Sequence, residues 1–203
     1  MRLFLVIITI SIIQLGSFAQ SDLSNSKLGI KTSFNLSSIT GSALMNPKVK
    51  FGYTAGSYFI SNTKKKTSVY AEIIGNFKGS NFNNGDTGYS KIALFYVDAS
   101  LLPLFRLQND HAICIGPTVS YLGLSSLYVG EKKKSEIDKL NIKPWDYSIA
   151  LYYHVPKSIV TFQFGTKMGL RNLNNNLSLD NISPNINPNG TIRNISVEIG
   201  MIF

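Results

Sequence analysis

The chain has 203 residues, 44% of them hydrophobic, and carries a formal net charge of +9 at pH 7. This length indicates a single domain, and the lone cysteine, Cys114, excludes an intrachain disulfide. Part of the basic surplus lies in two lysine runs, residues 64–66 and 132–134, both in apparent turns. Solvated loops explain most such runs, and contact with acidic lipopolysaccharide is the alternative. Nucleic acid is not expected as a partner, because the first residues form an export signal.

Residues 1–19 have the parts of a secretory signal peptide. A positive residue, Arg2, precedes an apolar run that continues to Ile13, and small residues follow as far as Ala19. The apolar run is shorter than the ~20 residues that a membrane-spanning helix needs. We therefore expect cleavage after Ala19 and a mature β-barrel domain of residues 20–203.

Two-residue alternation recurs through the mature chain and predicts eight β-strands. Each strand has one apolar face and one face of small polar or charged side chains, and no helical period of useful length appears. The predicted strands are 27–36, 51–60, 67–77, 91–105, 112–121, 144–155, 159–171 and 193–203. Short turns alternate with long segments rich in Asn, Ser and Gly, and the long segments are 38–50, 78–90, 123–143 and 172–191.

Alternation alone leaves two barrels open, since a lipocalin-like barrel points its apolar face inward and a membrane barrel points it outward. Three features favour the membrane barrel. The polar faces carry few charges, aromatic residues gather near the strand ends, and 10–12 residues span the ~25 Å apolar band of a bilayer. The sequence predicts an all-β fold, an eight-stranded antiparallel up-and-down transmembrane β-barrel with short periplasmic turns and long extracellular loops. Its location is the outer membrane of a Gram-negative bacterium.

The charged residues of the polar faces are the candidate functional residues. Side chains fill the interior of an eight-stranded barrel, which argues against a pore, and a buried charge needs a partner. We expect a structural charge network in the lumen. It comprises Lys31, Glu72, Asp98, Lys167, Arg171 and Glu198.

Catalytic, cofactor and metal sites are not expected. Some small barrels trim lipid A with a histidine, a serine and an acid, but His111 and His154 are predicted near the periplasmic rim, without such partners at the right depth. One cysteine and two separate histidines make no metal-ligand cluster. Cys114 is expected to fill space in the lumen.

The closing "SVEIGMIF" completes the predicted barrel. Pairing of this strand with residues 28–36 would close the sheet and leave no free edge. A terminal aromatic on the lipid face resembles the signal that the barrel-assembly machinery recognises. Phe203 is therefore the predicted assembly signal.

Several segments together resemble the PorT-like outer-membrane β-barrel proteins, within the wider OmpX/OmpA-like group of eight-stranded barrels. "LGIKTSFNLSSITG" is similar to the opening strand of that family, and "VYAEIIGNFKG" to its third strand, with Glu72 at an acidic position. "YVDASLLPLF" echoes a later strand, with Asp98 in place of glutamate and Ser100 in place of proline. "IGPTVSYL" and "GTKMGLRNL" match two further strands, and Lys167 stands for the usual arginine. The resemblance implies an eight-stranded barrel and no assigned biochemical activity.

Two classes of function remain open. The first is a non-enzymatic structural or interaction protein whose extracellular loops contact a surface, ligand or partner. The second is an accessory component of a secretion or envelope-assembly machine; a lipid A-modifying enzyme and a small pore rank below both. The expected partners are outer-membrane lipid, lipopolysaccharide, the barrel-assembly machinery during insertion and a protein that the sequence does not identify.

Overall fold

The computed structural model describes residues 25–42, 47–83, 89–129, 132–136, 142–175 and 189–203. Within these residues the chain forms strands joined by turns and one short 3-10 helix, η3 (Gln108–Asp110). No helix in this part of the chain is long and apolar enough to cross a membrane. The strands are β1 (Lys27–Thr40), β2 (Lys50–Ile60), β3 (Thr67–Asn83), β4 (Tyr89–Arg106), β5 (Ala112–Val129), β6 (Lys132–Glu136), β7 (Trp145–Lys157), β8 (Val160–Gly169) and β9 (Arg193–Ile202).

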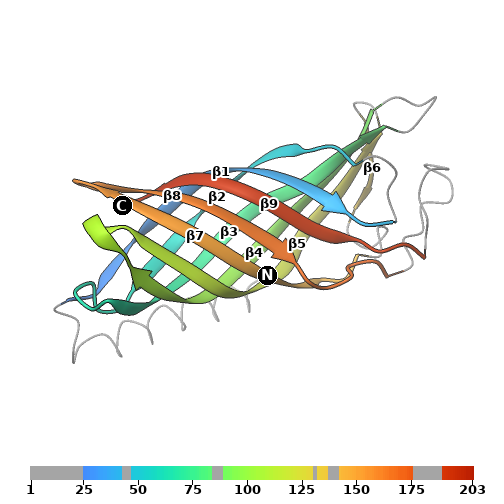
Figure 1. Cartoon of the computed structure of the whole chain (residues 1–203). Helices are drawn as coiled ribbons and strands as arrows, with labels where there is room; N and C mark the ends of the chain where they lie inside the picture. Colours follow the sequence, from blue (N-terminus) through green and yellow to red (C-terminus); the bar gives the residue numbers. More distant parts are fainter. Residues whose placement is uncertain (1–24, 43–46, 84–88, 130–131, 137–141, 176–188) are drawn as a thin grey trace, which may run out of the picture.

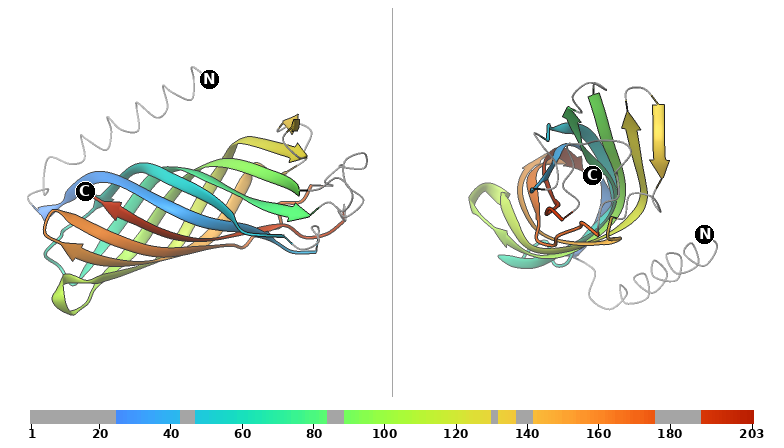
Figure 2. Two further views of the ribbon diagram at one scale, coloured as in Figure 1. Left: turned by 90° about the horizontal axis from the view of Figure 1, so that it is seen from above. Right: turned by 90° about the vertical axis from the view of Figure 1, so that its right-hand side faces the viewer.

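The strands other than β6 form a closed antiparallel barrel (Figures 1 and 2). Neighbours pair in the order β4-β3-β2-β1-β9-β8-β7-β5, and pairing of β4 with β5 closes the ring. The predicted pairing of the last strand with the first, called the seam below, is confirmed. β9 pairs with β1 from Lys31 opposite Ile202 to Thr40 opposite Arg193. Closure satisfies the backbone groups that a free sheet edge would leave unpaired. The predicted eight-stranded up-and-down barrel is confirmed.

Alternate side chains of each strand point into the barrel and away from it. On β1, Phe34 is 64% exposed on the outside while Lys31 is fully buried inside. The outer face is a belt of exposed Leu, Ile, Val and aromatic residues, as is typical of a barrel wall that faces lipid. The apolar faces therefore point outward, as the sequence predicted.

Aromatic side chains on the outer face stack across neighbouring strands near the end that carries the long loops. Ring centroids lie 4.5 Å apart for Tyr53 and Phe77, and 4.7 Å apart for Phe77 and Phe95. Tyr121 and Trp145 meet edge to face at 4.9 Å. Girdles of aromatic residues, with the amphipathic rings of Tyr and Trp among them, are typical of the level where a membrane meets water.

β3 and β5 are longer than predicted. β3 was predicted to end at Phe77 and ends at Asn83, and β5 was predicted to end at Tyr121 and ends at Val129. The pairing of β5 with β4 shifts by one residue between Phe95 and Tyr96 of β4, which is a β-bulge. Up to Leu122 the even-numbered residues of β5 point inward, and from Ser125 the odd-numbered residues do. The two-residue alternation breaks at the bulge, which is why the sequence pattern stopped there.

The two lysine runs lie at opposite ends of the barrel. Residues 64–66 belong to the turn between β2 and β3, as predicted. Residues 132–134 do not form a turn but begin β6, which pairs with the outer end of β5. Residues 1–24, with the predicted signal peptide, lie outside the described part of the chain.

Candidate functional site in the barrel lumen

The lumen is built in three layers, which the inward residues of β4 display in order. Leu94 and Tyr96 face the layer at the long-loop end, Asp98 and Ser100 the middle, and Leu102 the layer at the short-turn end. The upper layer also contains Ile39, Phe82, Ile92, Leu122, Leu127, Ile142, Leu173 and Ile192. The lower layer contains Tyr58, Ile60, Tyr70, Leu104, Ala112, Cys114, Ala150, Tyr152 and Ile202. Apolar side chains thus pack on both sides of a charged middle layer.

Glu72 on β3 lies at the centre of the middle layer. Its Oε2 accepts from Lys31 Nζ at 2.9 Å, and Lys167 Nζ lies 3.5 Å from its Oε1. Ser100 and Tyr152 also donate to Oε1, at 3.0 and 2.7 Å. The carboxylate is 2% exposed. Two cations and several hydroxyl donors offset the cost of taking this charge out of water.

Asp98 on β4 forms a second centre beside the first. Its Oδ2 accepts from Lys167 Nζ at 2.9 Å and from Asn76 at 2.8 Å, and Lys78 Nζ lies 3.2 Å away. Lys167 contacts both Asp98 and Glu72, so it joins the two centres. Lys78 also lies 5.0 Å from the centroid of the Tyr96 ring.

Lys31 connects the centres to the seam strand β9. Its Nζ donates to Glu198 Oε1 at 2.6 Å as well as to Glu72, and it lies 4.2 Å from the centroid of the Tyr152 ring. Gly165 of β8 faces Glu198, and a Cβ atom at that position would strike the Tyr152 ring. The glycine at position 165 therefore leaves room for the Tyr152 ring, which packs against Lys31.

The structure brings together five of the six predicted network residues and leaves out Arg171. That residue follows the last residue of β8, Gly169, so it no longer points into the lumen. Its side chain instead donates to the Trp145 carbonyl at 3.2 Å and lies over the Tyr147 ring. The prediction for Arg171 was wrong because the strand ends two residues too early.

Lys78 belongs to the network although the sequence did not predict it, and it supplies a cation in addition to Lys31 and Lys167. It lies on β3 six residues after Glu72, so the two-residue repeat puts both on the same face. Lys78 was predicted to lie in a loop, because the polar residues after it resemble loop composition. Extending the alternation beyond Phe77 would have found it.

Phe203 lies at the seam, on the outer surface of the short-turn end. It is 46% exposed, and its amide donates to the Ile30 carbonyl at 3.0 Å. Tyr58, which points inward from β2, donates to the Phe203 carbonyl at 2.9 Å. The backbone of the last residue is thus held from the lumen while its ring stays outside.

Both histidines lie at the short-turn end. His154 is 3% exposed, accepts from Gln163 at 2.9 Å and lies 4.0 Å from Cys114 Sγ. His111 lies 2.5 Å from the Tyr153 hydroxyl. Neither histidine contacts both a serine and an acid among the described residues. In the same part of the chain, no three His, Cys, Asp or Glu side chains are grouped to hold a metal ion.

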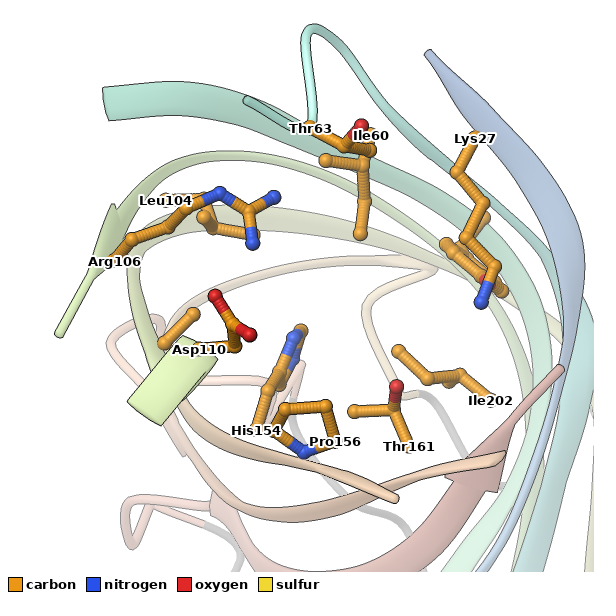
Figure 3. A pocket seen from close by; sticks show the side chains of 12 residues that line it. Lys27, Ile60, Thr63, Leu104, Arg106, Asp110, His154, Pro156, Thr161 and Ile202 are labelled. Carbon is orange, nitrogen blue, oxygen red and sulfur yellow. The ribbon is translucent and has the colours of Figure 1, made fainter. Parts of the chain in front are cut away.

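A cavity of about 200 Å³ opens at the short-turn mouth (Figure 3). Lys27, Arg106 and Asp110 lie around it, with His154 on its inner side and Ile202 on its wall. The lower apolar layer separates it from the charged middle layer. The cavity is therefore a vestibule and does not continue into a channel through the described residues.

No family model matches the sequence, and neither does any curated protein. Among solved structures, Neisserial surface protein A (NspA) matches with a TM-score of 0.54 at 9% identity, over 87% of this chain and 97% of that one. Ail, the attachment invasion locus protein of Yersinia pestis, matches with a TM-score of 0.42 at 10% identity, over 89% and 100%. Its complex with the heparin analogue sucrose octasulfate gives 0.44 at 10% identity, over 88% and 99%. At 9% identity, the likeness to NspA concerns the fold, which is that of an outer-membrane barrel.

Proposed function

We propose that this chain is a non-enzymatic outer-membrane protein of a Gram-negative bacterium, in which a sealed barrel presents an interaction surface outside the cell. The observation that carries the proposal is the contrast along the barrel axis. The lumen is filled by a neutralised charge network between two apolar layers, whereas one side of the wall continues past the outer aromatic residues.

Strand length supports the assignment of the outer surface. β8 and β9 have 10 residues each, which spans an apolar band of about 25 Å at the tilt of a membrane barrel. β3 has 17 residues, and β4 and β5 have 18 each. At the same tilt the surplus residues reach ~20 Å beyond the band. These outer ends of β3, β4 and β5, together with β6, are called the extension below.

The packed lumen supports a structural role for the barrel. A pore needs a polar, water-filled path, but the described interior has apolar layers on both sides of its ion pairs. The two histidines favour no lipid A chemistry, since both lie at the end opposite the extension. The barrel therefore serves as a rigid, membrane-anchored base.

The lysines of β6 are the proposed contact with lipopolysaccharide. Residues 132–134 lie in the extension, at the outer end, where acidic headgroups would surround the barrel. Residues 64–66 lie at the opposite end and have no such role. A free edge strand such as β6 also offers backbone donors and acceptors to a partner chain.

Three finer assignments belong to the same proposal. Signal peptidase would remove residues 1–19 and leave a mature chain that begins at Gln20. The intact mass of the protein from the membrane would show this cleavage. Phe203 would act as the assembly signal. Membership of the PorT-like proteins rests on the similar segments of sequence quoted above.

The proposal is tested by cross-linking and affinity capture from native outer membranes. The tagged full mature chain is compared with a variant in which residues 130–141, which include β6, are replaced by a glycine-serine linker of the same length. We expect surface partners or lipopolysaccharide to be captured by the intact chain and to be lost with the variant. Capture of the same periplasmic or inner-membrane complex by both proteins would contradict the proposal and favour the accessory role.

A further inference from the structure

Asp146 differs from the other lumen carboxylates because no cation of the described residues pairs with it. Glu72, Asp98 and Glu198 each lie within 4.0 Å of a lysine nitrogen. Asp146 is 1% exposed, and its Oδ2 accepts from Asn194 at 2.9 Å, but its Oδ1 has no partner in the described part of the chain. An ionised carboxylate in this position carries an uncompensated charge, which is costly.

Two further buried oxygens without partners lie next to Asp146. Ser120 of β5 is directly opposite Asp146 in the register, and Ser148 is two residues along β7 on the same inward face. Ser120 is fully buried and Ser148 is 5% exposed. Neither hydroxyl has a hydrogen-bond partner among the described residues. Orphaned buried oxygens of this kind indicate a ligand that the protein chain itself does not supply.

No side chain of β8 covers these oxygens at position 169. Gly169 is opposite Ser148, and a Cβ atom built on it would lie 2.9 Å from the Asn194 carbonyl oxygen and 3.5 Å from Asp146 Oδ1. The glycine therefore leaves Asp146 Oδ1 without a side-chain neighbour from this position. Asp146, Ser120 and Ser148 are called the oxygen pocket below.

The lysines that face this part of the lumen have other partners. Lys78 lies 3.2 Å from Asp98, and Lys167 lies within reach of both Asp98 and Glu72. Lys50 of β2 donates to the Lys78 carbonyl at 3.2 Å. A move of Lys78 or Lys167 to Asp146 would break an ion pair elsewhere, so these two lysines do not neutralise the oxygen pocket without cost.

We propose that the oxygen pocket binds a sodium ion. Carboxylate and hydroxyl oxygens are ligands that hard cations prefer. One carboxylate balances one positive charge, whereas a divalent ion would leave excess positive charge near the lysines of the middle layer. The ion would join β5 to β7 from inside and balance the charge of Asp146, which no lysine nitrogen of the described residues contacts.

The test measures thermal unfolding of the full mature barrel, folded in detergent micelles, in NaCl and in choline chloride at equal ionic strength. Choline is a quaternary ammonium ion that carboxylate and hydroxyl oxygens do not coordinate as they do Na⁺, so the pair of salts separates ion binding from screening. We expect the unfolding temperature to rise with the logarithm of the Na⁺ concentration above that in choline, because a ligand that binds only the folded state stabilises it. Broadening of the ²³Na resonance by the folded barrel is the second readout.

Variants identify the ligands. Asp146→Asn should abolish both the sodium-dependent rise and the broadening, and so should the double variant Ser120→Ala/Ser148→Ala, which retains the carboxylate. Glu198→Gln is the matched control, because Glu198 is also a buried carboxylate but pairs with Lys31. It should keep both sodium effects. Equal unfolding temperatures in the two salts, or full sodium effects in the Asp146→Asn variant, would overturn the proposal; equal temperatures indicate that water or a proton occupies the pocket.

Discussion

The two sides of the barrel wall have very different strand lengths. β8 and β9, on the short side, have 10 residues each, whereas β4 and β5, on the tall side, have 18 each. Both sides supply inward charges to the same middle layer, through Lys167 and Glu198 on one side and Asp98 on the other. The part of the eight barrel strands below the extension is called the ring. All eight strands contribute to the ring, whereas only the tall side contributes to the extension. Stability should depend on the ring, and surface contacts on the extension.

The largest effect is expected in the ring, at Glu72. Glu72→Ala leaves Lys31 without one of its two carboxylates and deprives Lys167 of one partner. Breaking a buried ion pair from one side costs about 3–5 kcal/mol in the free energy of unfolding. Urea unfolding of the barrel in detergent measures this change. Arg171→Gln, outside the network, is the control and should change the free energy by less than ~0.5 kcal/mol; equal effects of the two substitutions would refute the network.

The second effect concerns insertion of the ring at its seam. Phe203→Asp places a charge on the lipid face, where the backbone of Phe203 is held by Ile30 and Tyr58. We expect less protein in the outer-membrane fraction and more degraded or periplasmic protein. Phe162→Asp is a matched control on the same outer face, 40% exposed and away from the chain end. If Phe203 has a specific role in insertion, Phe203→Asp lowers the amount of protein in the outer membrane more than Phe162→Asp does. Equal losses would show that the effect is only the cost of placing a charge in lipid.

The boundary between ring and extension is tested at Lys78. Lys78→Met removes one of the two lysines beside Asp98, which keeps Lys167 and Asn76. A loss of about 1–3 kcal/mol in the free energy of unfolding is expected, less than at Glu72. Lys91→Met, which changes an exposed lysine of β4, should be nearly silent. If Lys78→Met is silent as well, the network does not reach this boundary.

The smallest effect on stability is expected in the extension itself. Among the described residues β6 pairs with β5 alone, so replacement of residues 130–141 by a glycine-serine linker of the same length removes no described pairing of the ring. The free energy of unfolding should change by less than ~1 kcal/mol, while partner capture is lost. A loss of stability comparable to that of Glu72→Ala would show that the extension belongs to the folded core.

The ring could be predicted from the sequence, because a bilayer imposes a simple rule on it. Phe34 and Lys31 on β1 must point to opposite sides, and this rule identified the eight strands, the seam and five charged residues of the lumen. Beyond the bilayer the two-residue geometry continues, but the apolar signal is lost because Asn81, an outward residue of β3 there, is polar as well. Lys78 was missed for that reason, and the outer half of β5 was missed because a bulge interrupts its repeat.

Partners across the lumen could not be read from the chain. Alternation places Glu72 inside, but it does not say that Lys31 and Lys167 both reach it across the barrel. Nor does it show that Asp146 has no cation, since that depends on where the long lysine side chains end. Arg171 illustrates the opposite error, in which the correct periodicity was extended beyond the end of β8.

Cysteine labelling of whole cells tests most directly whether the ring spans the outer membrane with the extension outside the cell. Cys114 is buried, so a Cys114→Ser background makes any added cysteine unique. Lys132→Cys in β6 and Lys65→Cys in the β2–β3 turn are then treated with a membrane-impermeant maleimide. We predict that Lys132→Cys is labelled on intact cells and that Lys65→Cys is labelled only after lysis. Labelling of Lys65→Cys on intact cells, or protection of Lys132→Cys until lysis, would contradict the account.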